Sequence, residues 1–231
     1  MMPKIREFRT TRSSLLTTKL LQAKKEDGQP AFNFMDLRQL SICLEDKQNI
    51  RYLLQNAKLL EKLHILLNGF QTFEGLHNIL SASAGTLKVL DMTVYLSVDY
   101  DGAICQVNLP LRGLCKELEA MAGHNMLESL SLEVIVNRYE TADIIGSMIQ
   151  SVENVLVKPG WSALKQITFE VSVSCCRREN TCEKLAEELQ SLLRDKYLSR
   201  LSKLDLVTLK FSSYVAKPDS GHYPIQRRSN I

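Results

Sequence analysis

The fold is decided by a short stretch of sequence, Leu127-Glu128-Ser129-Leu130-Ser131-Leu132. Its last three residues alternate apolar, polar and apolar, which predicts a β-strand with one buried face and one exposed face. The first leucine lies three residues before the second, and it anchors the chain where the chain turns into the strand. The same spacing recurs along the sequence, so this stretch is one unit of a repeating pattern.

The phrase occurs six times in the same order, as an apolar residue, two variable positions, an apolar residue, one variable position and a third apolar residue. Consecutive copies begin between 23 (60 − 37) and 40 (127 − 87) residues apart. The copies span residues 37–42, 60–65, 87–92, 127–132, 164–169 and 201–206. Such self-similarity is the signature of a repeat architecture.

Helical segments are predicted between the copies. Apolar residues recur at helical spacing in segments 111–123, 141–157 and 180–193, and a shorter segment holds Leu76, Ile79 and Leu80 before Gly85. Parallel strands need crossover connections of this kind. The sequence therefore predicts an α/β solenoid shaped like a horseshoe, with parallel strands on the concave face and helices on the convex face.

The phrase resembles the core of a leucine-rich repeat, and the second copy also has the asparagine of the longer consensus, Asn68. Residues 34–211 resemble the repeat region of fungal F-box/leucine-rich-repeat-like proteins, most closely at residues 49–63 and 160–165. This resemblance implies a horseshoe that recruits a substrate for a ubiquitin ligase through a coupled F-box module. Only the second copy has the asparagine, and residues 1–33 contain no recognisable F-box. We expect either a truncated relative or a protein that works without that coupling.

Three regions are expected. Residues 1–33 form a basic arm, because residues 1–25 carry seven basic side chains and one acidic one, whereas the whole chain has a net charge of +3. We expect a capping helix in this arm, docked through Leu15, Leu16, Leu20 and Leu21, although its composition also fits a mitochondrial transit peptide. Residues 34–211 form the solenoid, and residues 212–231 a polar tail in solvent.

The fifth residue of each phrase, which lies between its last two apolar residues, is expected on the exposed face of the sheet. The residue two positions further on is expected on the same face. These two rows give the candidate binding residues Ser41, His64, Asp91, Thr93, Ser131, Glu133, Thr168, Glu170 and Asp205. Polar and acidic residues concentrate in the later copies, which suits a basic or hydrogen-bonding partner. The alternative is a solvated sheet face with no ligand, because alternation alone places polar residues there.

Other chemistry finds little support in the sequence. The cluster from Cys175 to Cys182 has no second ligand pair for zinc, so we expect no metal site and no cofactor. Segment 99–102 is expected to be a turn, since its spacing does not fit a calcium loop. No phosphate-binding loop, serine elbow or metalloprotease motif occurs. Aromatic residues make up 6% of the chain and are not interleaved with basic ones, so no nucleic-acid partner is expected.

The composition indicates an ordinary globular chain of 231 residues, 45% hydrophobic and 24% charged. It contains no apolar run long enough for a membrane span and no secretory signal, so we expect no membrane partner and an intracellular location, cytoplasmic or nuclear. The expected function is non-enzymatic binding of a polypeptide on the concave sheet face. Two alternatives stay open: a structural scaffold, and an enzyme that uses the cysteines at 175–182.

Overall fold

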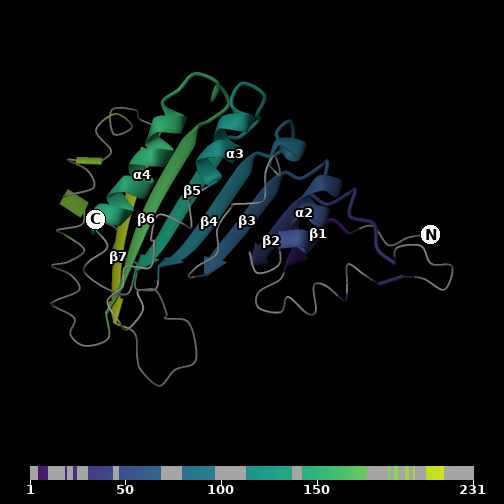
Figure 1. Ribbon diagram of the computed structural model, residues 1–231, viewed down its shortest axis with the longest axis horizontal. Coiled ribbons are helices and arrows are strands. Elements are labelled where there is room, and N and C mark those ends of the chain that lie inside the picture. The colour runs from purple at the N-terminus through teal and green to yellow at the C-terminus, as the bar shows by residue number, and fades with distance from the viewer. Residues whose placement is uncertain are drawn as a thin grey trace.

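The structure, a computed structural model, describes part of the chain. The described residues are 5–9, 19, 23–24, 31–43, 47–68, 80–96, 113–136, 142–175, 187, 190–191, 196–197, 200 and 207–215. Within them the protein is an α/β fold built on one open, all-parallel sheet (Figure 1).

The sheet holds seven strands that lie side by side in chain order. They are β1 (Glu7–Arg9), β2 (Gln39–Cys43), β3 (Lys62–Asn68), β4 (Val89–Leu96), β5 (Ser129–Val136), β6 (Gln166–Cys175) and β7 (Val207–Val215). Because every strand neighbours the next one in the sequence, each connection moves the chain forward by one strand. The expected parallel strands are thus present at five of the six phrases where the sequence placed them, and the sixth is displaced as described below.

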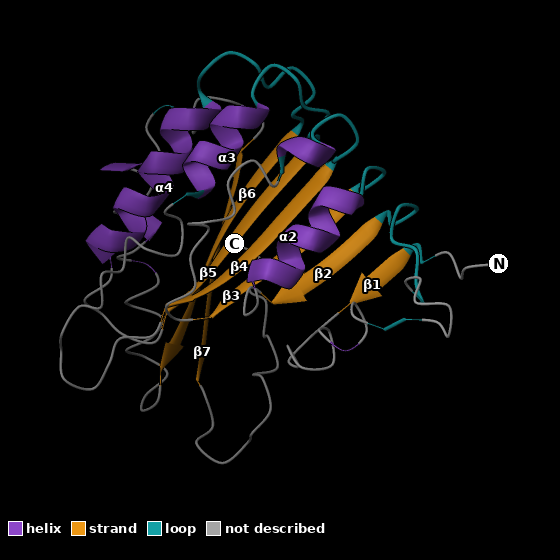
Figure 2. Cartoon of the chain, turned by 45° about the vertical axis from the view of Figure 1, so that its right-hand side comes forward, coloured by secondary structure: helices purple, strands orange, loops and turns teal. Residues whose placement is uncertain are grey.

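The helices lie against one face of the sheet (Figure 2). They are α2 (Lys47–Asn56), the short 3-10 helix η1 (Ser81–Ser83), α3 (Leu114–Met121) and α4 (Ala142–Leu156). The segments expected at 111–123 and 141–157 are confirmed as α3 and α4. Helix α2 was not predicted from the sequence. Most of the helix expected at 180–193 lies outside the described residues, as do residues 76 and 79.

The core lies between the sheet and the helices. The apolar positions of the first five phrases face this layer, and the first leucines Leu37, Leu60, Leu87 and Leu127 are fully buried. Trp161 is buried there too, and its indole N–H donates to the carbonyl oxygen of Val155 at 3.2 Å. The tryptophan thus packs in the core beside the carboxyl end of α4.

The strands begin with the same pair of hydrogen bonds in consecutive units. The carbonyl oxygen of Glu61 accepts the N–H groups of Lys88 and Val89, at 2.8 and 3.0 Å. The same pair of bonds occurs at the starts of β2, β3, β5 and β6, where the accepting carbonyls belong to Arg6, Arg38, Lys88 and Glu128. Strands β2 to β6 thus share one hydrogen-bond geometry at the edge where they begin.

Side chains of alternating charge follow the same edge. Arg38 contacts Glu61, and the Lys165 ammonium donates to Glu128 at 2.7 Å. The hydrogen bond from Lys165, with the charges of Lys165 and Lys88, lowers the pKa of Glu128. These exposed ion pairs contribute little to stability each, but they favour this register over a shift that would bring like charges together.

Both expected regional boundaries need correction. Arm residues Glu7–Arg9 form β1, where Phe8 packs edge-on against Phe34 with 5.8 Å between the ring centroids. At the other end β7 continues to Val215, so four residues assigned to the tail belong to the sheet. Leu15, Leu16, Leu20 and Leu21, expected in a capping helix, lie outside the described residues.

Candidate functional site

The candidate site lies on the face of the sheet opposite the helices, which we name the polar face. Strand alternation turns the fifth residue of each of the first five phrases toward it. Parallel register places Ser41, His64, Asp91, Ser131 and Thr168 opposite one another in a single row. A second row, two residues further along, contains Thr93, Glu133 and Glu170. Eight of the nine expected binding residues therefore share this face.

Asp205 is the exception, because the sixth phrase was placed three residues too early. Thr208 pairs with Thr168 and Lys210 pairs with Glu170, so these residues continue the two rows on β7. The sequence from Leu204 to Leu209 fits the same apolar spacing as residues 201–206, and spacing alone cannot choose between overlapping solutions. In the observed register Asp205 is the second residue of its phrase, and it lies outside the described residues.

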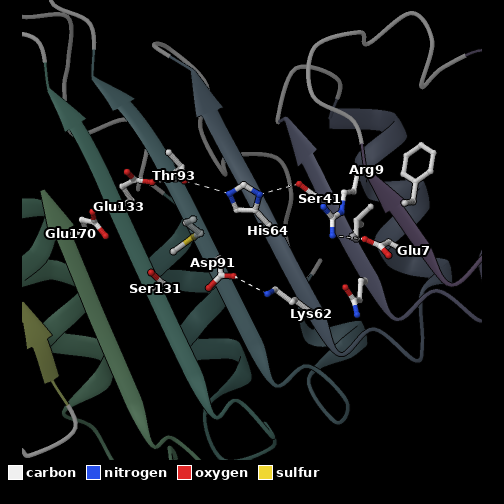
Figure 3. Close-up of a pocket in the computed structure, with 14 residues that line it drawn as sticks. Glu7, Arg9, Ser41, Lys62, His64, Asp91, Thr93, Ser131, Glu133 and Glu170 are labelled. Carbon is white, nitrogen blue, oxygen red and sulfur yellow. Dashed lines mark hydrogen bonds and ion pairs between the residues drawn. The ribbon is translucent and has the colours of Figure 1, made fainter. Parts of the chain in front are cut away.

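A hollow of about 360 Å³ opens on the polar face over β1 to β6 (Figure 3). Seven of the expected binding residues line it, Thr168 does not, and Asp205 lies outside the described residues. Three further charged residues line the hollow without having been predicted from the sequence: Glu7, Arg9 and Lys62. The signal for Lys62 was available, since it lies two residues before His64 on the same face of β3. Glu7 and Arg9 could not be assigned without knowing that β1 joins the sheet.

The polar face is only partly open to solvent. Half of the lining residues are half-buried, the exposed ones lie on β1, β2 and β3, and Thr93 is only 9% exposed. Toward the carboxyl ends of β5 and β6 the same face is buried at Ile135 and Ser172. The hollow is therefore a bounded depression among ordered side chains and not a flat solvated surface.

A chain of hydrogen bonds crosses four strands at the floor of the hollow (Figure 3). Ser41 Oγ lies 3.0 Å from Nδ1 of His64, and Nε2 of His64 lies 3.4 Å from Thr93 Oγ1. The Thr93 hydroxyl donates to Glu133 Oε2 at 3.1 Å. These four residues come from β2, β3, β4 and β5, so strand register alone brings them together.

The carboxylate of Glu133 fixes the direction of this chain, because an ionised carboxylate only accepts hydrogen bonds. Thr93 donates its one hydroxyl hydrogen to Glu133, so its oxygen accepts from His64. A neutral imidazole carries a single N–H, which must then be on Nε2. Nδ1 keeps its lone pair and accepts the hydroxyl hydrogen of Ser41.

The surroundings of His64 favour this neutral form. Burial lowers the pKa of His64 below its ordinary value of 6.5, and the charge of Asp91 opposes this effect. The charges of Lys62 and Arg9 lower the pKa further. The imidazole is consequently uncharged at neutral pH, as the hydrogen-bond chain requires.

The two cationic side chains among the described lining residues each form an ion pair with a carboxylate of the hollow. The Lys62 ammonium lies 3.8 Å from Asp91 Oδ2, and the Arg9 guanidinium lies 2.6 Å from Glu7 Oε1. Both cations lie toward β1 and β3, whereas Glu133 and Glu170 lie on β5 and β6 (Figure 3). Among the described lining residues, the cations thus lie on β1 and β3, and the carboxylates lie on β1, β4, β5 and β6.

Metal binding and cysteine chemistry gain no support from the described residues. No group of three metal-ligating side chains occurs in the described part of the chain. Of the cysteine cluster, residues 176–182 lie outside the described residues. Burial, with the charge of Glu119, raises the pKa of the Cys115 thiol, so this cysteine is less reactive than an exposed one.

The fold and the polar face define an α/β protein with a sequentially ordered parallel sheet that is covered by helices on one side. Comparison with models of protein families, with curated proteins and with solved structures gives no match. Among the described residues, no helix is both long and apolar enough to cross a membrane. The function must therefore be inferred from the site itself.

Proposed function

We propose that this chain is a leucine-rich-repeat-like solenoid that binds a polypeptide partner on the polar face of its sheet. The strand order, the single helical layer and the repeated bonds at the strand entries support the solenoid, since each unit contacts chiefly its neighbours. The resemblance to F-box/leucine-rich-repeat-like proteins suggests that the partner is a ubiquitin-ligase substrate.

The observation that carries the proposal is the hydrogen-bonded row over the hollow. A solvated sheet face needs polar side chains but does not need them connected across four strands. Here Ser41, His64, Thr93 and Glu133 hold one another in place, so their polar atoms are ordered before a partner arrives. Such pre-organisation lowers the entropic cost of binding.

The contact between Ser41 and His64 also resembles a nucleophile beside its base, but binding is the better explanation. Acyl transfer needs N–H donors aimed at the developing oxyanion. In a parallel sheet the backbone N–H groups point sideways to the neighbouring strands and not out of the face. Ser41 lies in the middle of such a strand, between β1 and β3.

Filling the hollow tests the proposal. Ser131→Trp places a large side chain among the lining residues, whereas Ser151→Trp places the same side chain on the exposed surface of α4. Both proteins should keep the circular dichroism spectrum of the wild type. We expect a polypeptide captured from cell extract by the wild type and the Ser151 variant to be lost from the Ser131 variant. Equal recovery with both folded variants would place the binding site elsewhere and leave a scaffold role.

A further inference from the structure

The imidazole of His64 lies between two hydroxyl groups that have opposite roles. Ser41 Oγ lies 3.0 Å from Nδ1, and Thr93 Oγ1 lies 3.4 Å from Nε2 (Figure 3). Thr93 donates its hydroxyl hydrogen to Glu133, so Nε2 donates to Thr93 and Ser41 donates to Nδ1. While the ring is neutral, Ser41 therefore offers a ligand only the lone pairs of its oxygen.

Protonation of the ring reverses one of these two hydrogen bonds and leaves the other unchanged. An imidazolium carries a hydrogen on both nitrogens, so Nδ1 becomes a donor that needs an acceptor. Ser41 Oγ, at 3.0 Å, is that acceptor, and it must turn its own hydrogen away from the ring. Nε2 keeps its bond to Thr93. Because Ser41 lines the hollow, its hydrogen then becomes available to a ligand there.

The reversal depends on the direction of three hydrogen bonds and not on the net charge of the polar face. The surrounding charges set only the pH at which it occurs. Burial lowers the pKa of His64 below 6.5, Asp91 opposes this effect, and Lys62 and Arg9 lower the pKa further. The other titratable residues described on this face are Glu7 on β1, Cys43 on β2, Tyr95 on β4, Glu133 on β5 and Glu170 on β6.

We propose that Ser41 and His64 form a proton-operated switch, in which Ser41 accepts a hydrogen bond from the partner polypeptide while the imidazole is neutral and becomes a donor when it is protonated. This inference rests on the proposed function and names how the site is regulated. A polypeptide supplies the matching N–H and O–H groups from its backbone and polar side chains. Two donors that face each other cannot pair, so acidification releases this group of the partner.

Nitrogen NMR of the full chain tests the switch without a partner, because long-range proton–nitrogen correlation identifies which imidazole nitrogen carries hydrogen. The wild type should carry it on Nε2 at about pH 8 and on both nitrogens below a midpoint that is lower than 6.5. Thr93→Val removes the acceptor of Nε2–H and should raise the share of the Nδ1–H form at least about fivefold. Thr168→Val changes the same type of buried residue on β6, outside the hydrogen-bond chain, and should leave that share unchanged. A neutral ring with its hydrogen on Nδ1, or a ring that stays neutral down to about pH 4.5, would overturn the inference.

Partner binding provides the second readout, with the purified polypeptide that the wild type captures as the probe. The dissociation constant is measured about one pH unit above and below the midpoint found by NMR, where His64 is mostly neutral and mostly protonated. Below the midpoint it should rise about fivefold for the wild type, which corresponds to one lost hydrogen bond. It should change less than about twofold for His64→Gln, whose amide does not titrate, and for Ser41→Ala, which has no hydroxyl to turn. Unchanged or tighter wild-type binding, or a pH dependence that either variant keeps, would overturn the inference.

Failure of the switch is distinguishable from failure of the proposed function. Ser131→Trp, assayed above the midpoint, reports whether the partner occupies the hollow at all. Loss of capture by this variant, together with a pH dependence that His64→Gln keeps, would leave the proposed function standing and overturn the switch. Equal capture by Ser131→Trp and the wild type would overturn both.

Discussion

Leu130 and Ser131 are consecutive residues of β5, and the structure assigns them to opposite faces of the sheet. Leu130 is fully buried, and its neighbours in register, Leu90 and Ile167, are buried as well. Leu130→Ala removes side-chain volume from a central strand that cannot close the cavity easily. We expect the free energy of unfolding to fall by about 3.5 kcal/mol. Ser131→Ala should change it by less than about 0.5 kcal/mol.

Urea unfolding monitored by circular dichroism measures this difference. With a urea dependence of about 2.5 kcal/mol/M, the Leu130 variant should unfold at a midpoint about 1.4 M below the wild type, and the Ser131 variant within about 0.2 M of it. The slope must stay the same for the comparison to hold. A small shift for Leu130→Ala, or a larger shift for Ser131→Ala, would mean that the two faces of the sheet are assigned wrongly.

Three further predictions concern glycines and pH. A Cβ on Gly146 would lie 2.1 Å from the ring of Tyr197, so thermal unfolding should show Gly146→Ala destabilised by about 2 kcal/mol. Gly160 has φ +116°, and a Cβ added to it would lie 2.6 Å from the backbone nitrogen of Gly123. Gly160→Ala should therefore lower the free energy of unfolding by at least about 2 kcal/mol. Gly85→Ala, where an added Cβ meets nothing within 4 Å, should leave it within about 0.5 kcal/mol. The pKa of His64 is lower in the folded chain than in the unfolded chain. Below about pH 6.5 the unfolded chain therefore binds more protons, and acidification favours unfolding. Between about pH 7 and about pH 5 the free energy of unfolding should thus fall by more in the wild type than in His64→Gln.

Much of the sheet could be predicted because the phrase encodes two physical requirements at once. An alternating segment must bury one face, and a preceding leucine must anchor the turn into it. Where both occur without ambiguity, as at Leu87 and Leu127, the strands lie in the predicted register. At the last strand two overlapping phrases satisfy the same requirements, so only contact with β6 decides between them.

Other elements left weaker signals in the sequence. The strand at Glu7–Arg9 has a single apolar residue, Phe8, and its assignment depends on distant partners in β2 and Phe34. Helix α2 buries Ile50, Leu53 and Leu54 within ten residues, which is a short stripe for periodicity analysis. Such elements depend on tertiary contacts more than on local pattern.

The candidate site was predictable as a row but not as a network. Alternation placed Ser41, His64, Thr93 and Glu133 on one face. Their hydrogen bonds depend on strand register and on side-chain conformations, which the sequence does not disclose. The charge of the hollow likewise depends on Arg9, which reaches the site only because β1 joins the sheet beside β2.

Site-specific photo-cross-linking tests the central claim, that a polypeptide partner lies on the polar face. A benzophenone amino acid at position 131 places the reactive group in the hollow, and the same residue at position 151 places it on the exposed surface of α4. We predict a partner adduct from position 131 and not from position 151. Adducts to the same partner from position 151 but not from position 131 would contradict the account.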